Sequence, residues 1–182
     1  GMTGSGKTGL CIALLEEDGL GYVRAVGNLQ ELKTAAGPNG STATTGLGHT
    51  RWATHGAVTE HNAHPLTGCN DAKLAIVLNG IVENYRELRD ELQARGHAFS
   101  SETDAEVVAH LLEEARANDD LVAATRAVYA RLEGHFTFVV INHDDPQRLV
   151  DLAGREVAQA LEQLRRDDVA TGDQQPAVAG AG

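Results

Sequence analysis

The stretch TGLGHTRWATHGAVTEHNAHP, residues 45–65, gathers one arginine, one tryptophan, one asparagine and four histidines in a segment without a helical or strand period. We predict a strand end that continues into a long loop, and loops that carry many specific side chains usually carry function. Two later segments share this character: residues 78–80, at the end of an apolar run, and residues 101–104, at the start of a predicted helix. We predict that the three segments form one pocket for a free amino acid.

The bulk properties are those of an ordinary globular domain. The chain has 182 residues, 42% of them hydrophobic, which is enough for one domain with a real core. The formal net charge of −11 argues against nucleic acid or an anionic membrane as a partner, because both require a basic face. No apolar run approaches the roughly 20 residues of a membrane span, and no signal peptide opens the chain, so we expect a cytoplasmic location. The two cysteines, Cys11 and Cys69, are too few for a disulfide framework.

Periodicity and turn signals predict an α+β domain. Predicted strands lie at residues 21–26, 74–78 and 135–141, with another beginning near 148–150. Predicted helices lie at residues 29–36, at 85–95 with Asn84 as its cap, from the capping box Thr103-x-x-Glu106 to residue 117, and at 121–132. The apolar residues 11–16 fit either a helix or a strand, and Asp18-Gly19 is a turn signal that makes a hairpin possible.

Arg51 and Asp104 together suggest a site for an α-amino acid. A planar guanidinium can bind a carboxylate through two parallel hydrogen bonds, and a carboxylate can hold an ammonium group. Taken alone, Arg51 would be a surface arginine, and Asp104 would complement the dipole of the helix that follows it. The pair, rather than either residue, indicates a pocket for a zwitterion.

Asn79 and Gly80 follow the apolar run of residues 74–78 and allow two interpretations. The first is a tight turn, which this dipeptide commonly forms. The second is an oxyanion hole, in which the asparagine amide and a backbone N–H at the glycine stabilise a developing negative charge.

The four histidines of the opening stretch suggest a zinc site, but their spacing fits no standard pattern and Cys69 lacks a paired neighbour. We therefore predict neither a metal nor a cofactor. Trp52, next to Arg51, fits a core position or a pocket wall.

The first eight residues match the phosphate-loop pattern G-x-x-x-x-G-K-[ST] in full. In such a loop Gly6 and Lys7 would contact phosphates and Thr8 would bind magnesium. No strand precedes this segment in the sequence and no apolar run ends in an aspartate, so a glycine-rich segment without a nucleotide is the preferred interpretation.

Four motifs occur in the order and spacing of a known family: HTRWATHG at 49–56, NAHP at 62–65, NGIVEN at 79–84 and SETDAEVVAHL at 101–111. With them, residues 12–150 resemble the glutaminase domain of glutamine–fructose-6-phosphate aminotransferase, a class II glutamine amidotransferase. The resemblance implies an N-terminal-nucleophile hydrolase fold, an α/β/β/α sandwich of antiparallel sheets. It also implies hydrolysis of glutamine to glutamate and ammonia for glucosamine 6-phosphate synthesis.

The resemblance assigns roles to the motif residues. Four of them would hold glutamine by its carboxylate and ammonium groups: Arg51, Thr54, His55 and Asp104. Asn79 and Gly80 would form the oxyanion hole. Trp52 would lie where the pocket meets the sugar-phosphate isomerase domain, which this chain lacks, and His64 would line the site.

The chain also departs from the family. The family's nucleophile is an N-terminal cysteine whose own amino group assists it, whereas this chain opens with Gly1 and Cys11 lies inside the sequence. The opening segment instead resembles the phosphate loop and first helix of P-loop ATPases. We therefore expect a fold that is incomplete at both ends and a domain that is catalytically impaired. We also expect marginal folding or pairing with another chain, with a homodimer as one form of that pairing.

The resulting division of the chain has four parts. Residues 1–11 would be a P-loop-like segment of foreign origin, 12–150 a partial glutamine amidotransferase domain, 151–168 an amphipathic helix and 169–182 a disordered tail. The alternatives from other classes are a P-loop nucleotide-binding module and a non-catalytic glutamine-binding domain.

Overall fold

The computed structural model describes residues 8–38, 40–51, 57, 59–69, 73–117, 120–146 and 149–153. The chain divides into two units, Gly1–Leu152 and Ala153–Gly182. Almost all described residues belong to the first unit, and the account below concerns that unit. None of the described helices is long and apolar enough to cross a membrane.

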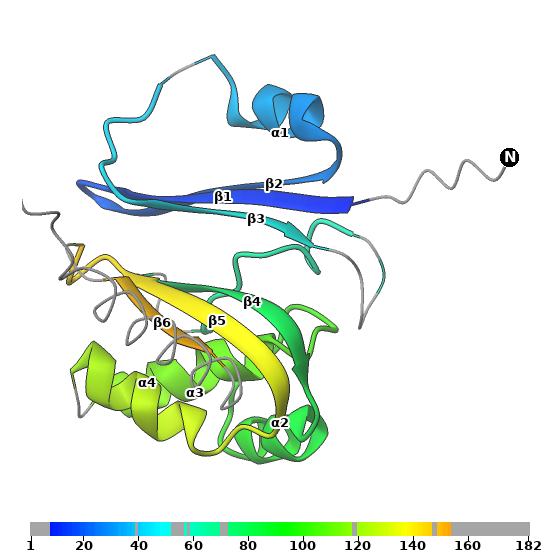
Figure 1. Cartoon of the computed structure of the whole chain (residues 1–182), viewed down its shortest axis with the longest axis vertical. Coiled ribbons are helices and arrows are strands. Elements are labelled where there is room, and N and C mark those ends of the chain that lie inside the picture. Colours follow the sequence, from blue (N-terminus) through cyan, green and yellow to red (C-terminus); the bar gives the residue numbers. More distant parts are fainter. Residues whose placement is uncertain are drawn as a thin grey trace, which may run out of the picture. The chain divides into compact units, whose positions relative to one another are not determined.

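The first sheet has three antiparallel strands in the order β2-β1-β3 (Figure 1). They are β1 (Thr8–Glu16), β2 (Gly19–Gly27) and β3 (Gly46–Arg51). The first two form the hairpin that the Asp18-Gly19 signal allowed, with Glu16 opposite Gly19. Residues 11–16, which fitted either a helix or a strand, are therefore a strand.

The course of β1 contradicts the likeness of the opening segment to P-loop ATPases. A phosphate loop leads into a helix whose N-terminus binds the phosphates, but Thr8 begins a strand that pairs on both sides, with β2 and β3. The expected boundary between residues 11 and 12 falls within this continuous strand. Gly6 and Lys7 lie outside the described residues.

The second sheet has the order β4-β5-β6. Its strands are β4 (Leu74–Val82), β5 (Gly134–Asn142) and β6 (Leu149–Ala153). The prediction of a strand from residue 74 is confirmed, but β4 runs through Asn79 and Gly80, so of the two interpretations of this dipeptide the tight turn is wrong. Residues 151–153 belong to β6, so the predicted helix does not begin at 151; the rest of that helix and the predicted tail lie outside the described residues.

Among the described residues four helices accompany the sheets, and their bounds lie within three residues of those predicted. They are α1 (Leu29–Ala36), α2 (Tyr85–Ala94), α3 (Glu106–Arg116) and α4 (Leu121–Tyr129). Asn84 occupies the predicted N-cap position of α2 but makes no side-chain capping bond, and α3 lacks the predicted capping box, because tertiary partners compete for the side chains. Asn84 bonds the backbone of Arg131 and Glu133, and Glu106 bonds residues upstream of Thr103.

Strand alternation sorts the apolar residues into three layers of core. On β1, Leu10 and Ile12 pack on the side of α1, while Cys11 and Ala13 face the second sheet. On β4, Ala75 and Val77 belong to this layer between the sheets, and the intervening residues face the other helices. The order of layers is α1, first sheet, second sheet, then α2–α4 (Figure 1), so the predicted α/β/β/α sandwich of antiparallel sheets is confirmed.

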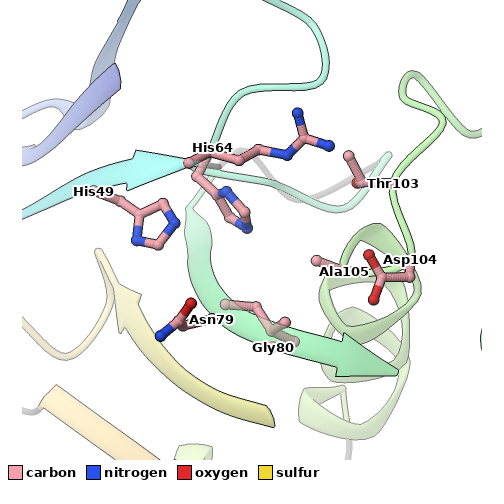
Figure 2. Close-up of a pocket in the computed structure, with 9 residues that line it drawn as sticks. His49, His64, Asn79, Gly80, Thr103, Asp104 and Ala105 are labelled. Atoms are coloured by element: carbon pink, nitrogen blue, oxygen red, sulfur yellow. The ribbon is translucent and has the colours of Figure 1, made fainter. Parts of the chain in front are cut away.

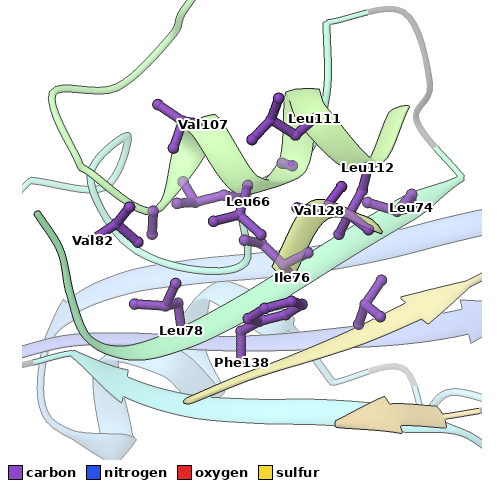
Figure 3. Packing of buried hydrophobic residues seen from close by; sticks show 14 of the residues in the cluster. Leu66, Leu74, Ile76, Leu78, Val82, Val107, Leu111, Leu112, Val128 and Phe138 are labelled. Carbon is purple, nitrogen blue, oxygen red and sulfur yellow. The ribbon is translucent and has the colours of Figure 1, made fainter. Parts of the chain in front are cut away.

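The largest core lies between the second sheet and helices α2–α4 (Figure 3). Most of its fully buried members come from β4, β5 and α3, among them Leu74, Ile76, Phe138, Val107 and Leu112. This core fixes α3 against β4, and both elements lead directly into the candidate site.

Replacing Phe138 by alanine should lower the free energy of unfolding by about 3–5 kcal/mol, because the ring is fully buried and leaves a cavity. Urea denaturation followed by circular dichroism measures the change. Ile81→Ala, at an exposed position of the neighbouring strand, is the control and should change stability little. Equal losses for both variants would contradict the described core.

Candidate functional site

Strand β3 carries two polar side chains into the space between the sheets. Its alternate residues Leu47, His49 and Arg51 share one face, and Leu47 belongs to the apolar layer that joins the sheets. At the end of the strand the apolar residues give way to His49 and Arg51. Arg51 is only 5% exposed, so its guanidinium has a buried setting rather than the surface position expected of a lone arginine.

Asn79 and Gly80 lie near the end of β4, opposite Thr137 and Phe136 of β5. Gly80 has φ of +116°, and a Cβ added there would lie 2.1 Å from the carbonyl oxygen of His135. Only glycine fits this conformation and this approach. Asn79 shares a strand face with Ala75 and Val77 and points toward His49 in Figure 2.

Asp104 reaches the same region from the turn before α3. It is 4% exposed, and its Oδ2 accepts a hydrogen bond of 2.8 Å from the backbone N–H of Val82. This bond ties the turn to the end of β4, two residues beyond Gly80. The acid therefore has a fixed position beside the predicted oxyanion hole.

A buried carboxylate, Glu106, holds the turn that carries Asp104. Its two oxygens accept hydrogen bonds from the N–H and hydroxyl groups of Ser100 and Ser101, at 2.6–2.9 Å. Burial alone would raise the pKa of Glu106, but hydrogen bonds from His110, Ser101 and Ser100 outweigh it and lower the pKa to about 2. Ser101 in turn bonds the hydroxyl of Thr103 at 2.8 Å.

Asn62 ties the loop after β3 to the same turn. Its amide nitrogen donates to the carbonyl of Ala57 and to a carboxylate oxygen of Glu102, both at 3.0 Å, and its oxygen accepts from the N–H of Glu102 at 2.9 Å. Asn62 is fully buried. Sequence reasoning gave no role to Asn62 or Ser101 and treated Glu106 as half of a capping box.

The three predicted segments do meet at one pocket of about 350 Å³, a figure that includes the space at its open mouth (Figure 2). Its lining residues are His49, Arg51, His64, Leu78, Asn79, Gly80, Thr103, Asp104 and Ala105. The structure thus brings together five of the residues singled out from the sequence. Trp52, Thr54 and His55 lie outside the described residues.

The pocket contains one positive and one negative group next to neutral rings. Burial lowers the pKa of Arg51 and the charge of Asp104 raises it, so the guanidinium keeps its charge at neutral pH. Burial also lowers the pKa of His49, helped by the charge of Arg51. The imidazole of His64, 4.5 Å from that of His49 between ring centroids, has its pKa lowered to about 3 by burial, His49, Arg51 and Arg24.

Neither cysteine lines the pocket among the described residues. Cys11 is 3% exposed between the sheets, and burial raises the pKa of its thiol to about 12, so its thiolate fraction at pH 7 is on the order of 10⁻⁵. Cys69 lies in the loop that follows Leu66, beside α3. In the described part of the chain, therefore, neither cysteine supplies a nucleophilic thiol to this pocket.

The fold is shared with solved structures of known proteins. Two solved structures share the fold at 24% identity over 76% of this chain, which is 30% of each of theirs. They are glutamine phosphoribosylpyrophosphate amidotransferase from B. subtilis in complex with ADP and GMP, with a TM-score of 0.64, and an allosteric regulatory enzyme of purine biosynthesis, with a TM-score of 0.65. The chain therefore shares the fold of these two enzymes.

Sequence comparison identifies the family. Residues 49–155 match the glutamine amidotransferase domain, and the chain belongs to this family. Similar proteins are the glutamine–fructose-6-phosphate aminotransferases (isomerizing) of Idiomarina loihiensis, 47% identical over 141 residues, and Thermosynechococcus vestitus, 50% identical over 143 residues. Each match covers 76% of this chain but 23% of the relative, so the chain spans about a quarter of their length.

His64 should make the protein less stable as the pH falls below 6.5. Its folded pKa of about 3 lies below the ordinary value of 6.5, so the unfolded chain binds the proton first, and stability that is complete above pH 6.5 is lost toward pH 3. The cost should reach about 2 kcal/mol at pH 5. Urea unfolding at pH 7.5, 6 and 5 measures it, and His64→Gln should flatten the profile. An unchanged profile in the variant would contradict a neutral, buried His64.

Proposed function

We propose that this chain is the glutamine-using domain of a glutamine–fructose-6-phosphate aminotransferase. The observation that carries the proposal is the pocket in which Arg51 and Asp104 lie beside Asn79 and Gly80. A free amino acid with an amide side chain presents a carboxylate, an ammonium group and an amide carbonyl. The pocket offers a complementary group for each of the three.

Binding would begin with the two charged groups. The guanidinium of Arg51 would take the α-carboxylate through two hydrogen bonds, and Asp104 would take the ammonium group. Both side chains are at most 5% exposed, so these interactions would form with little competition from water. With its α-carboxylate and ammonium group held there, glutamine would extend its side-chain amide toward the end of β4.

Asn79 and Gly80 would act on the amide carbonyl. Attack at the amide carbon places negative charge on its oxygen, and one preorganised donor to such an oxygen is worth roughly 3 kcal/mol of barrier. The overall reaction consumes glutamine and water and yields glutamate and ammonia. His49 and His64 would be neutral at pH 7 and would not compete with Arg51 for the carboxylate.

The rest of the aminotransferase would use the ammonia. The relatives are named for fructose 6-phosphate, so the sugar-phosphate isomerase domain is the expected partner of this one. A cytoplasmic location belongs to the proposal, because a phosphorylated sugar is charged and does not cross membranes unaided. A homodimer stays a prediction.

Arg51→Ala should weaken the binding of L-glutamine by roughly 10- to 100-fold, because it removes charge-assisted hydrogen bonds to the α-carboxylate. Isothermal titration calorimetry with the 182-residue chain measures the affinity. Arg126→Ala, at an exposed position on α4, is the matched control and should bind like the wild type. Equal affinity of Arg51→Ala and the control would refute the assignment of the pocket.

The 182-residue chain by itself should release no glutamate from glutamine above background. The reason is that neither Cys11, with a buried thiol, nor Cys69 lines the pocket. A coupled glutamate dehydrogenase assay gives the rate, with Cys11→Ala and Cys69→Ala alongside. Turnover by the wild type that disappears in one of the two variants would show that a thiol does reach the glutamine.

A further inference from the structure

A second group of reactive side chains lies outside the glutamine pocket. Cys69 comes from the loop after Leu66, His97 from the segment after α2, and His110 and Glu113 from adjacent turns of α3. One ligand-type atom from each lies within 4.8 Å of all the others. None of the four lines the glutamine pocket.

The distances in this cluster match the edges of a tetrahedron around zinc. The Nδ1 atoms of His97 and His110 are 3.2 Å apart, and Sγ of Cys69 is 3.4 Å from Nδ1 of His97. Zinc with bonds of about 2.0–2.1 Å to nitrogen and about 2.3 Å to sulfur would hold these pairs about 3.3 and 3.6 Å apart.

The carboxylate of Glu113 completes the same tetrahedron. Its Oε2 lies 3.6 Å from Sγ of Cys69, 3.4 Å from Nδ1 of His97 and 3.6 Å from Nδ1 of His110. A tetrahedral zinc site would separate oxygen from sulfur by about 3.6 Å and oxygen from nitrogen by about 3.4 Å. Five of the six edges are thus within about 0.2 Å of those expected for zinc.

The outer nitrogens of both imidazoles face carboxylates. Nε2 of His97 lies 3.0 Å from Oε1 of Glu114, and Nε2 of His110 lies 3.6 Å from Oε1 of Glu106. At His97 the hydrogen bond from Nε2 to Glu114 keeps the proton there and directs the lone pair of Nδ1 inward, which is how histidine ligands are usually oriented. Two Nδ1 atoms that converge with a carboxylate and a thiol create a site that attracts a cation.

The loop that carries Cys69 fits closely against α3. The N–H of Cys69 donates to Oε2 of Glu113 at 3.2 Å, and a Cβ added to Gly68 would lie 2.6 Å from the same oxygen. The side chains of His97, His110 and Glu113 are at most 10% exposed. The cluster is therefore a built site with one open side at Cys69.

We propose that Cys69, His97, His110 and Glu113 bind one Zn²⁺ ion in a structural site. The thiol would lose its proton on binding, so thiolate, carboxylate and two neutral imidazoles would balance the two positive charges. Sulfur, nitrogen and oxygen donors together suit zinc, and four protein ligands leave no position for a substrate. The ion would join the loop at residues 66–69 to α3 and to the segment after α2.

The test uses the 182-residue chain after dialysis against a chelator. Titration with Co²⁺ should give one equivalent of binding, the visible bands of tetrahedral cobalt and a thiolate-to-metal charge-transfer band, and Zn²⁺ should displace the cobalt. Saturating Zn²⁺ should raise Tm by at least about 5 °C over the chelated protein. Failure of the wild type to bind either ion would overturn the proposal.

Variants assign the ligands. Cys69→Ala should abolish the charge-transfer band and lower Co²⁺ affinity at least about 100-fold, while Cys11→Ala, which removes the other thiol, should keep both. His97→Asn should weaken binding to a similar extent, with the exposed His135→Asn as its control. Circular dichroism of each chelated variant checks the fold. Binding that survives both Cys69→Ala and His97→Asn would place the metal elsewhere and refute the site.

Discussion

The hydrogen bonds to the buried carboxylate of Glu106 are the constraint on which both candidate sites depend. A carboxylate that is 1% exposed is stable only if its oxygens are satisfied, and Ser100 and Ser101 provide four donors. These bonds fold the segment before α3 back onto the start of the helix. Asp104 is thereby directed into the pocket, while His110, one turn further along, lies against the same carboxylate.

Helix α3 therefore serves two sites with its two ends. Asp104 and Ala105, just before its first turn, line the pocket, and His110 and Glu113 in its later turns belong to the metal-type cluster. The helix can hold both because Val107, Leu111 and Leu112 anchor it in the core against β4 and β5. A rigid support of this kind is what a site with several converging polar groups requires.

The sequence predicted the elements better than their capping and contacts. Apolar runs and helical periods located β4, β5 and all four helices, because local patterning reports which face of an element is buried. Prediction from the sequence failed where a polar side chain has both a local and a distant hydrogen-bond partner available. Asn84 and Glu106 were assigned to local caps, but their side chains bond residues elsewhere. The sequence did not decide whether Gly80 belongs to a turn or to an oxyanion hole, because the carbonyl of His135 that restricts this position is 55 residues away in the chain.

The same reasoning explains why the pocket was predictable and the metal-type cluster was not. The pocket residues lie in three dense polar segments, each of which is conspicuous by itself. The cluster instead takes one residue from a loop, one from the segment after a helix and two from a helix face, and only the i, i+3 spacing of His110 and Glu113 is visible locally. The four histidines around Arg51 were considered for zinc and rejected on their spacing. In the structure His49 and His64 line the pocket, whereas the sulfur of Cys69 lies beside His97. Ligands that are far apart in sequence have to be recognised from the fold that brings them together, and here that fold is held by α3.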